Sequence, residues 1–460
     1  MLFNSFPFLF IFLPCALTSY WLLGQNAAWR VPLLLGLSVV FYGLWNPEFI
    51  PLLGALIVID WVASRWFART QDRRILAVAI VATLGVLAAY KYVDFFTANV
   101  SRLTGVPIPA LQLALPVGIS FFTFHHIMYL SDLGRGRAQV APLDRYALYI
   151  CFFPQAAAGP LARWSEVGHQ FGRDAFATGW QQRWALGITF IIVGLIEKIG
   201  FGDPIGRLIT PIYHQALAGP VMDGSAWLAL GFGFQIFFDF AGYSDMAIGI
   251  AMLFGVRLPE NFNAPFRATS VLVFWQRWHM TLSRFLRDYV FLPLADMRVA
   301  GTRHTTAQYV MAIMVTMSLC GLWHGAGWNF VLWGAVQGVA IVGALAWRRT
   351  GLRLPGPAAW ALTAGLFLLS GILFRTPSLD AAWNVFAGLA AAPGWKILSS
   401  AWIIALAIGG ATVLPASRVI CEWLVRQASP LVPVLLGLAG IAIMVQLGGG
   451  DSYEFIYFRF

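Results

Sequence analysis

This chain has 460 residues, of which 59% are hydrophobic and only 11% are charged. Soluble domains carry roughly 25% charged residues, so the composition excludes an ordinary soluble enzyme, a disordered chain and a secreted disulfide scaffold. The net charge of +10 comes mainly from Arg in short segments between apolar runs. Positive charge there sets membrane orientation and meets anionic lipid, so it does not indicate nucleic acid as a partner.

Apolar runs long enough to cross a hydrocarbon core about 30 Å thick recur along the chain. We interpret residues 1–23 as a retained first span, because no Lys or Arg precedes the apolar stretch as it would in a signal peptide. Further predicted spans cover 31–45, 50–68, 75–93, 114–131, 184–200, 226–254, 307–322, 327–347, 357–374, 400–416 and 431–448. We expect an all-α polytopic membrane protein with about 11–12 transmembrane helices and a single membrane domain over residues 1–460.

Two stretches do not fit simple spans. Residues 146–163 are apolar but interrupted by Pro and Gly, and residues 271–298 mix aromatic side chains with Arg. Lipid cannot satisfy broken backbone, so such segments have to be buried in protein or line a wet cavity. We expect re-entrant or interfacial segments around a site; for residues 271–298, a surface amphipathic helix is the alternative. The four cysteines, predicted to be buried small hydrophobes without metal spacing, are Cys15, Cys151, Cys320 and Cys421.

The densest polar cluster is FWQRWHMTLSRFLRDYVFLPL, residues 274–294. On a helix, His279 and Ser283 would be i, i+4 neighbours. Basic side chains beside Trp suit a headgroup anchor or the phosphates of an anionic ligand, and an interfacial belt with a structural His279 is equally compatible with the pattern. The remaining candidate ligand-binding residues here are Trp275, Arg277, Trp278, Arg284, Arg287 and Asp288.

A second histidine lies in GLWHGAGWNFVLWG, residues 321–334, between two apolar runs. An ionisable group in a span is a functional hypothesis by default, and a neutral His324 can accept a proton from a hydroxyl nucleophile. Trp323 and Asn329 are the candidate substrate contacts beside it. Gly321 and Gly325 also form a small-xxx-small packing pattern, which leaves a structural role open.

Two other groups of polar residues carry weaker signals. Asp239 and Asp245 lie in an apolar stretch; they could bind a cation or proton in a transporter, but we favour ion pairs with Arg from residues 257–287. His125 and His126 are adjacent, so they cannot share one helix face, and no third ligand follows at zinc spacing. No metal site is expected.

The two histidine segments together resemble the membrane-bound O-acyltransferase family, in the bacterial branch that includes an alginate O-acetylation membrane subunit. Supporting segments are LPVGISFFTF (115–124), FFPQAAAGPLARWSE (152–166), LPENFNAPF and the tail FIYFRF (455–460). His125 and His126 stand where the family has Gln-Lys-like residues, and Phe285 where Trp is frequent. These departures bear on substrate choice and leave both motif histidines intact.

The resemblance implies helices around a central tunnel and a bacterial inner-membrane enzyme. Its members transfer an acyl group from a thioester to a hydroxyl, here acetyl from cytosolic acetyl-CoA towards an exported polysaccharide, usually with a periplasmic acetyltransferase partner. His324 matches the catalytic histidine, His279 the supporting one, and Tyr457 the tail tyrosine proposed as an acyl relay. An Arg-rich mouth at residues 277–298 would hold the donor phosphates. The alternatives are D-alanyl or other acyl transfer to an envelope polymer, and a transporter or flippase of polymer precursors.

Overall fold

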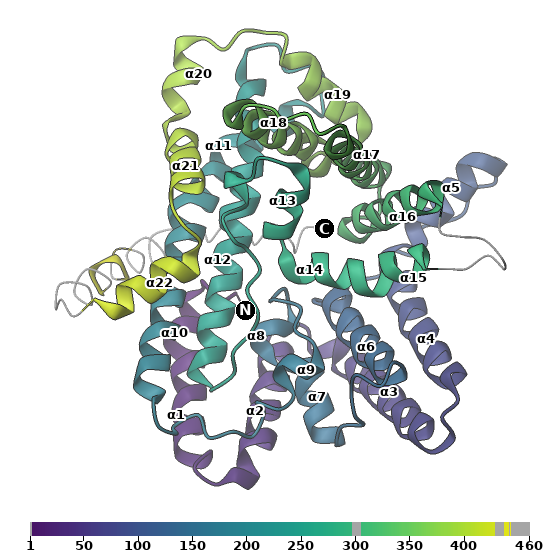
Figure 1. The fold of residues 1–460 in the computed structure, drawn as a ribbon, viewed down its shortest axis with the longest axis vertical. Coiled ribbons are helices and arrows are strands. Elements are labelled where there is room, and N and C mark those ends of the chain that lie inside the picture. The colour runs from purple at the N-terminus through teal and green to yellow at the C-terminus, as the bar shows by residue number, and fades with distance from the viewer. Residues whose placement is uncertain (1, 297–304, 428–436, 441, 443–460) are drawn as a thin grey trace. The chain divides into compact units, whose positions relative to one another are not determined.

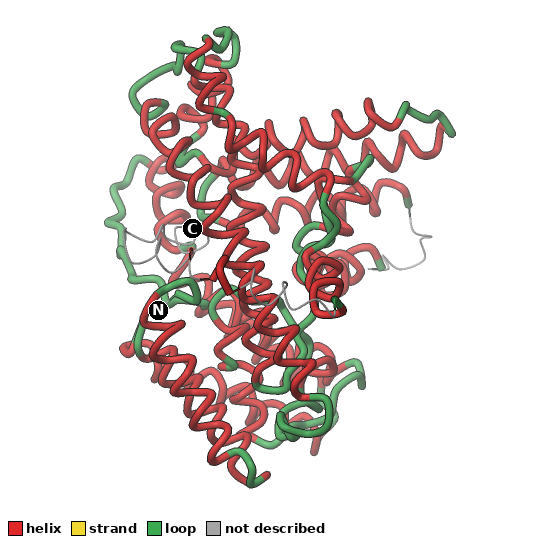
Figure 2. Tube along the Cα trace, turned by 90° about the vertical axis from the view of Figure 1, so that its left-hand side faces the viewer, coloured by secondary structure: helices red, strands yellow, loops and turns green. Residues whose placement is uncertain are grey.

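The computed structural model describes residues 2–296, 305–427, 437–440 and 442 (Figure 1). Throughout this part of the chain, all regular structure is helical, and loops make up the rest (Figure 2). The predicted all-α class is confirmed. The tail motif 455–460, with Tyr457, and Arg298 lie outside the described residues.

Fewer helices than expected have the length of a membrane span. Within the described residues, seven are long and apolar enough, or eight if the bent pair Trp402–Val413 and Ser417–Arg426 forms one span. Residues 8–23 and 27–43 form shorter apolar helices, and the predicted span 431–448 falls almost entirely outside the described residues. The seven are Pro47–Thr70, Arg73–Lys91, Trp180–Gln215, Ser225–Leu253, Thr306–His324, Trp328–Thr350 and Gly356–Arg375. The protein is therefore a multi-pass membrane protein.

The described residues form two compact units, each made of segments distant in sequence. The first contains residues up to 192, with 243–260, 421–427, 437–440 and 442; the second contains 193–242 and 261–420. Helices of the first unit are α1 (Leu13–Leu23), α2 (Ala27–Gly43), α3 (Ile50–Thr70), α4 (Arg73–Lys91), α5 (Val93–Thr104), α6 (Ile119–Gly134), α7 (Leu143–Cys151), α8 (Phe153–Ala156) and α9 (Trp164–Val167).

The second unit contains the two histidine segments. Its helices are α11 (Asp203–Gln215), α13 (Val271–Arg277), α14 (Met280–Phe285), α15 (Leu292–Ala295), α16 (Thr306–His324), α17 (Trp328–Thr350), α18 (Gly356–Arg375), α19 (Leu379–Gly388), α20 (Trp395–Ser400) and α21 (Trp402–Val413). Three helices contribute residues to both units: α10 (Trp180–Leu195), α12 (Phe232–Leu253) and α22 (Ser417–Arg426).

Side-chain caps fix where several of these helices begin. Asp72 accepts from the Arg74 amide at 2.9 Å before α4, and Thr305 accepts from the Gln308 amide at 3.1 Å before α16. Each cap satisfies one of the four backbone amides that a helix start leaves without a partner. Asp72 also places negative charge at the positive end of the α4 dipole.

The helices differ widely in how far protein surrounds them. The most apolar stretch of Ser225–Leu253, which contains α12, is 94% buried, whereas that of α4 is only 22% buried. A helix that is apolar on all sides and enclosed by protein forms core, whereas an apolar helix with an open face meets lipid. For the same reason the prediction that all four cysteines are buried is wrong for one of them: Cys15, on α1, is exposed.

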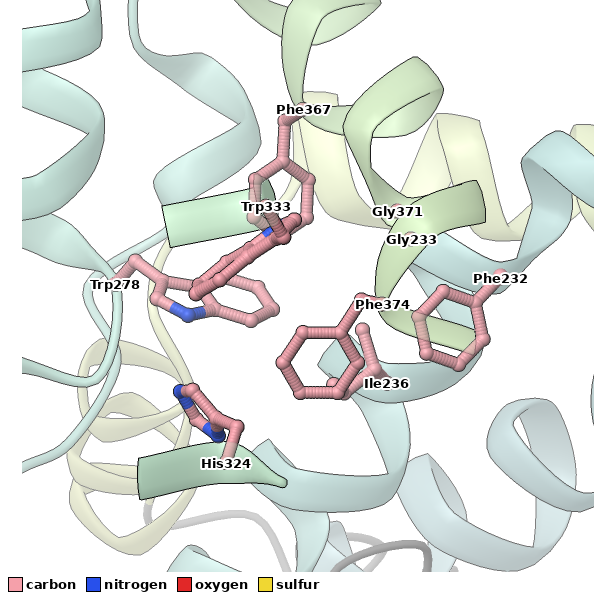
Figure 3. A pocket seen from close by; sticks show the side chains of 9 residues that line it. All are labelled: Phe232, Gly233, Ile236, Trp278, His324, Trp333, Phe367, Gly371 and Phe374. Atoms are coloured by element: carbon pink, nitrogen blue, oxygen red, sulfur yellow. The ribbon is translucent and has the colours of Figure 1, made fainter. Parts of the chain in front are cut away.

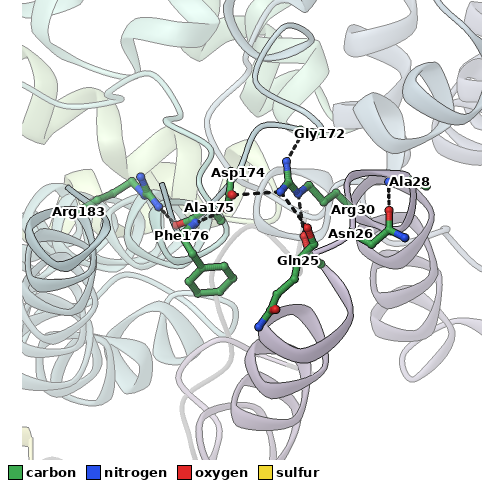
Figure 4. A network of polar contacts seen from close by, with 10 residues as sticks. Gln25, Asn26, Ala28, Arg30, Gly172, Asp174, Ala175, Phe176 and Arg183 are labelled. Atoms are coloured by element: carbon green, nitrogen blue, oxygen red, sulfur yellow. Dashed lines mark hydrogen bonds and ion pairs between the residues drawn. The ribbon is translucent and has the colours of Figure 1, made fainter. Parts of the chain in front are cut away.

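Arginine side chains tie down an irregular segment of the first unit (Figure 4). Arg30 donates to the Gly24 carbonyl at 2.7 Å and to the Gly172 carbonyl at 3.2 Å, and it pairs with Asp174 at 3.1 Å. Arg183 holds the carbonyl of Ala175 in the same segment. These charged hydrogen bonds connect residues 172–175 to the α1–α2 turn and to α10, where regular structure supplies no partners.

The interrupted stretch 146–163 is buried in protein. Helix α7 ends at Cys151, the short α8 follows, and residues 157–162 are buried without forming a helix. Its polar side chains bond to its own backbone: Gln155 donates to the Tyr149 carbonyl at 2.6 Å, and Tyr149 donates to the Ala162 carbonyl at 3.0 Å. This is the environment that broken apolar backbone needs in a membrane protein.

Candidate functional site

His279 lies at a sharp corner between α13 and α14. The helix breaks at Trp278, and His279 adopts a left-handed backbone conformation with φ of 40°. This conformation is uncommon for residues other than Gly and costs free energy, so the surrounding contacts have to hold it. His279 and Ser283 therefore do not lie within one uninterrupted helix, although the Ser283 amide still donates to the His279 carbonyl at 2.9 Å.

Asn261 provides the contacts that hold the corner. Its side-chain oxygen lies 2.9 Å from His279 Nδ1 and accepts from the Thr281 hydroxyl at 2.9 Å, while its carbonyl accepts from the Met280 amide at 2.8 Å. An amide oxygen can only accept, so His279 carries its proton on Nδ1 and leaves Nε2 as an acceptor. The loop residue Asn261 thus fixes both the orientation and the tautomer of the ring.

Burial keeps the His279 imidazole neutral. The residue is 1% exposed, and removal from water lowers the pKa of His279 to about 3. Desolvation penalises the charged form of the ring. A neutral ring with a defined tautomer can hold or orient a partner across the whole physiological pH range.

His324 ends α16 at a close helix–helix corner. A side chain at Gly321 would collide with the Phe330 carbonyl on α17, and one at Gly334 would collide with the Met317 carbonyl on α16. Only glycine lets the two backbones approach this closely. The small-residue pattern at Gly321 is therefore structural, and it holds the turn that presents His324.

Aromatic rings surround the His324 imidazole. His324 is only 5% exposed. The centroid of its ring lies 4.6 Å from the ring centroid of Trp323, 4.8 Å from that of Phe374 and 5.4 Å from that of Trp333. Trp323 also lies 6.3 Å from the His279 ring. One indole thus connects the two motif histidines, which the sequence places 45 residues apart.

A small apolar cavity adjoins His324 (Figure 3). Its volume is about 20 Å³, and a water molecule needs roughly 10–15 Å³ on this measure. The cavity therefore admits a group of a few atoms and excludes a long acyl chain. It is lined by Phe232, Gly233, Ile236, Trp278, His324, Trp333, Phe367, Gly371 and Phe374.

Some predicted ligand-binding residues lie at this cavity, and others are occupied with structural contacts. Trp278 lines the cavity, and the Trp275 ring lies 6.2 Å from that of Trp333. Asn329 instead donates to the Leu373 and Thr376 carbonyls, at 3.2 and 2.7 Å. Its amide nitrogen satisfies the C-terminal end of α18, and a substrate contact through Asn329 stays a prediction.

The basic residues of the segment are less enclosed. Arg287 pairs with Asp288 at 2.7 Å, with its side chain 61% exposed. Arg277 and Arg284 are half-buried, and the Ser283 hydroxyl donates to the Trp278 carbonyl at 3.2 Å. The structure thus keeps a positively charged edge beside the His279 corner, with Arg287 already neutralised by its neighbour.

The prediction that Asp239 pairs with Arg from residues 257–287 is wrong. Asp239 pairs with Lys198 at 2.6 Å, and Lys198 also binds Asp203 at 2.5 Å. Lys198 is fully buried in a π-helical turn, Ile196–Gly202. A lone Lys inside an apolar run gives no sequence signal for its partner. Because the Asp239 carboxylate already pairs with this lysine, the hypothesis of a transporter in which Asp239 binds a cation or proton is weakened.

Sequence reasoning missed several residues of the site. Phe232, Phe367 and Phe374 enclose the His324 cavity, but phenylalanine in an apolar helix is indistinguishable from ordinary core. Asn261 lies in LPENFNAPF, a segment that the family resemblance singled out. The contact between Asn261 and His279 depends on the fold, so the sequence alone could not predict it. Tyr457 lies outside the described residues, so its role stays a prediction.

The second unit therefore holds a buried corner histidine oriented by Asn261 and a second histidine beside a small aromatic cavity. The family model of the membrane-bound O-acyltransferases matches residues 107–384. The chain belongs to this family, and it is an O-acyltransferase.

Individual relatives extend the match over most of the chain. A probable alginate O-acetylase (AlgI) of Azotobacter vinelandii is 36% identical over 94% of this chain and 87% of its own length. The corresponding protein of Pseudomonas aeruginosa is 35% identical over 93% of this chain and 82% of its own length. A peptidoglycan O-acetyltransferase of Helicobacter pylori is 33% identical over 85% of this chain and 80% of its own length.

Proposed function

We propose that this protein transfers an acetyl group from cytosolic acetyl-CoA, across the bacterial inner membrane, towards hydroxyl groups of an exported polysaccharide. The observation that carries the proposal is His324: a buried imidazole at a rigid helix corner, beside a cavity of about 20 Å³. That volume suits a two-carbon acyl group and excludes a fatty acyl chain. The relatives named as alginate and peptidoglycan O-acetyltransferases support acetyl as the group transferred.

The chemistry assigned to His324 is general-base catalysis. The imidazole takes the proton from the attacking hydroxyl as the oxygen bonds to the acetyl carbonyl carbon, and the thiolate of coenzyme A leaves. A positioned base of this kind contributes typically about 10²–10⁴-fold in rate. His279 acts through orientation: with its proton held on Nδ1 by Asn261, it presents Nε2 as a fixed acceptor.

The bilayer explains why the acetyl group alone would pass. Coenzyme A carries phosphate charges, which hydrocarbon excludes, whereas an acetyl group is small and neutral. The half-buried Arg277 and Arg284 are the groups proposed to hold donor phosphates, because guanidinium binds phosphate in a bidentate manner. The attacking hydroxyl belongs to the polymer or to a periplasmic acetyltransferase partner that passes the acetyl group on to it, and a soluble hydroxyl compound can replace either in vitro.

The test uses purified protein in proteoliposomes with radiolabelled acetyl-CoA outside and a soluble hydroxyl acceptor inside. We expect label to reach the acceptor with the wild-type protein and not with His324→Ala. The matched control is His214→Ala, which removes an exposed histidine on α11. Normal transfer by His324→Ala would refute the assignment. Label that arrives from D-alanyl carrier protein and not from acetyl-CoA would replace acetyl by D-alanyl.

A further inference from the structure

The first compact unit contains a much larger cavity than the one beside His324. Its volume is about 650 Å³, and it lies among α2, α3 and α7, which pack against one another. Pockets that bind organic ligands have volumes of roughly 300–1,000 Å³. This cavity therefore has the size of a ligand site, although no step proposed for acetyl transfer uses it.

Most of the side chains that line this cavity are apolar. Leu35 and Val39 on α2 face Leu53 and Ile57 on α3, with Ala147 contributed by α7. A water molecule inside protein needs two to four polar partners, and these side chains offer none. The occupant has to be apolar.

Gly54 opens one wall. It lines the cavity on α3, and a Cβ added to it would meet no atom within 4 Å. The helix therefore leaves an unfilled space where a side chain would otherwise stand. Gly54 is exposed, so the cavity is open at this wall and a molecule from outside the protein can enter it.

The surroundings of α3 determine what that molecule is. Helix α3 lies within a membrane span, Pro47–Thr70, and 33% of its most apolar window is buried in protein. The remaining surface faces hydrocarbon, and the molecules with long apolar chains present there are lipids. Asp144 is exposed at the cavity, and a carboxylate belongs at a headgroup rather than among acyl chains.

We propose that the cavity among α2, α3 and α7 binds one acyl chain of a membrane phospholipid, with the headgroup at Asp144. Tyr42 also lines the cavity, and its hydroxyl is shielded from solvent and makes no hydrogen bond to the described residues. A phospholipid supplies ester oxygens that can accept from this hydroxyl. The bound chain fills the space beside Gly54 and completes the packing of the three helices.

The test fills the space with a side chain. Gly54→Leu should exclude the lipid chain without a backbone clash, since no atom lies within 4 Å of the added Cβ. Gly85→Leu is the matched control: this glycine, on α4, is also exposed, its Cβ would also meet no atom within 4 Å, and it does not line the cavity. Both changes remove a helical glycine and add the same apolar group, so lost lipid cannot be attributed to general effects of the substitution.

The first readout is native mass spectrometry of the full chain, purified in detergent after incubation with phosphatidylethanolamine. We expect one retained lipid for the wild type and Gly85→Leu, and at least a tenfold lower bound fraction for Gly54→Leu. Equal retention by the two variants, or none by the wild type, overturns the proposal.

The second readout maps the chain directly. Phosphatidylethanolamine with a photoactivatable group in its acyl chain should label peptides from α2, α3 and α7, and Gly54→Leu should remove that labelling. Labelling spread evenly over lipid-facing helices such as α4 would mean non-specific surface lipid and would also overturn the proposal. Neither readout depends on acetyl transfer, so the result stands apart from the proposed function.

Discussion

Two buried histidines, one in each compact unit, have opposite surroundings. His126 Nδ1 lies 2.8 Å from Asp60 and 2.7 Å from the Tyr146 hydroxyl, and Thr83 donates to the same Asp60 oxygen at 3.0 Å. His324 has aromatic rings around it and a cavity beside it. Both rings are at most 5% exposed. The two rings therefore differ in their neighbours and in the space beside them rather than in how far they are buried.

The polar partners of His126 join four helices of the first unit. Asp60 is on α3, Thr83 on α4, His126 on α6 and Tyr146 on α7. A buried hydrogen-bonded cluster of this kind fixes helices relative to one another, and its value lies in packing. The comparison thus supports a structural role for His126 and is consistent with the chemistry proposed for His324.

The largest expected effect is on acetyl transfer, and it separates the two rings. His324→Gln should lower the rate by about 10²–10⁴-fold, the usual value of a general base. His126→Gln should leave the rate per folded molecule within about threefold of the wild type, because no reacting group contacts it in this assignment. The measurement is radiolabel transfer normalised to folded protein. Equal losses of acetyl transfer in the two variants would contradict the different roles proposed for His324 and His126.

The next effect is on folding. Asp60→Leu should lower the free energy of unfolding by about 1–3 kcal/mol for each buried hydrogen-bond partner left unsatisfied, here Thr83 and His126. Asp60→Asn keeps an acceptor for Thr83 and His126 and should cost less. Thermal unfolding in detergent, followed by helical circular dichroism, gives the order. A variant Asp60→Leu as stable as the wild type would remove the structural role of the cluster.

A smaller effect on acetyl transfer is expected from disturbing His279, the ring proposed to support His324. Asn261→Ala should reduce acetyl transfer by about 10–100-fold, since one buried hydrogen bond left unmade costs roughly 1–3 kcal/mol. The loss should fall on kcat more than on KM if Asn261 acts by orienting His279. Asn263→Ala, in the same loop but exposed, is the control. A pure rise in KM would instead make Asn261 a binding group.

The cavity beside His324 offers a change in selectivity. Phe374→Ala removes one wall and should shift the preference from acetyl-CoA towards propionyl-CoA by about tenfold or more, the value of one methylene in an apolar pocket. Competition between the two donors measures it, so a partial loss of folded protein cancels. An unchanged ratio would show that the acyl group is selected elsewhere.

The smallest effect is a pH dependence of stability. Because burial lowers the pKa of His279 to about 3, the unfolded chain binds more protons than the folded protein between about pH 3 and the ordinary histidine value of about 6.5. The free energy of unfolding should therefore fall as pH drops below about 6.5, by up to about 1.4 kcal/mol per pH unit for this ring.

His279→Asn isolates that contribution. Asparagine tolerates the left-handed backbone at this position and does not titrate, so the variant should lose stability less steeply on acidification. Denaturant midpoints at pH 7, 6 and 5 provide the comparison. Identical slopes for the two proteins would mean that the ring keeps its ordinary pKa.

Sequence reasoning recovered the parts of this structure that depend on hydropathy. The runs that became α3, α4, α12, α17 and α18 were predicted as spans from composition alone, because apolar length reports the membrane directly. The two histidine segments were found through residues that are costly to bury. The sequence pattern could not predict which polar side chains contact one another. Lys198 with Asp239, and Asn261 with His279, are joined by the fold across 41 and 18 residues.

The sequence also could not predict the backbone conformation at His279. An apolar and basic pattern over 274–294 is compatible with one helix, yet the chain turns at His279. Local propensity gives no reason for a left-handed histidine; the contacts of Asn261, made from a neighbouring loop, outweigh it. Burial of Cys15 failed for a related reason, since apolar sequence in a membrane protein leaves open whether lipid or protein is the neighbour.

The glycine contact between α16 and α17 has a mechanical consequence. The backbones of Gly321 and Gly334 are in direct contact, so neither helix can slide along the other without steric overlap. The His324 imidazole therefore keeps a fixed position relative to α17. It can rotate about its own side-chain bonds but cannot travel. Donor and acceptor therefore have to be brought to a stationary base, and any gating motion belongs to the walls around it.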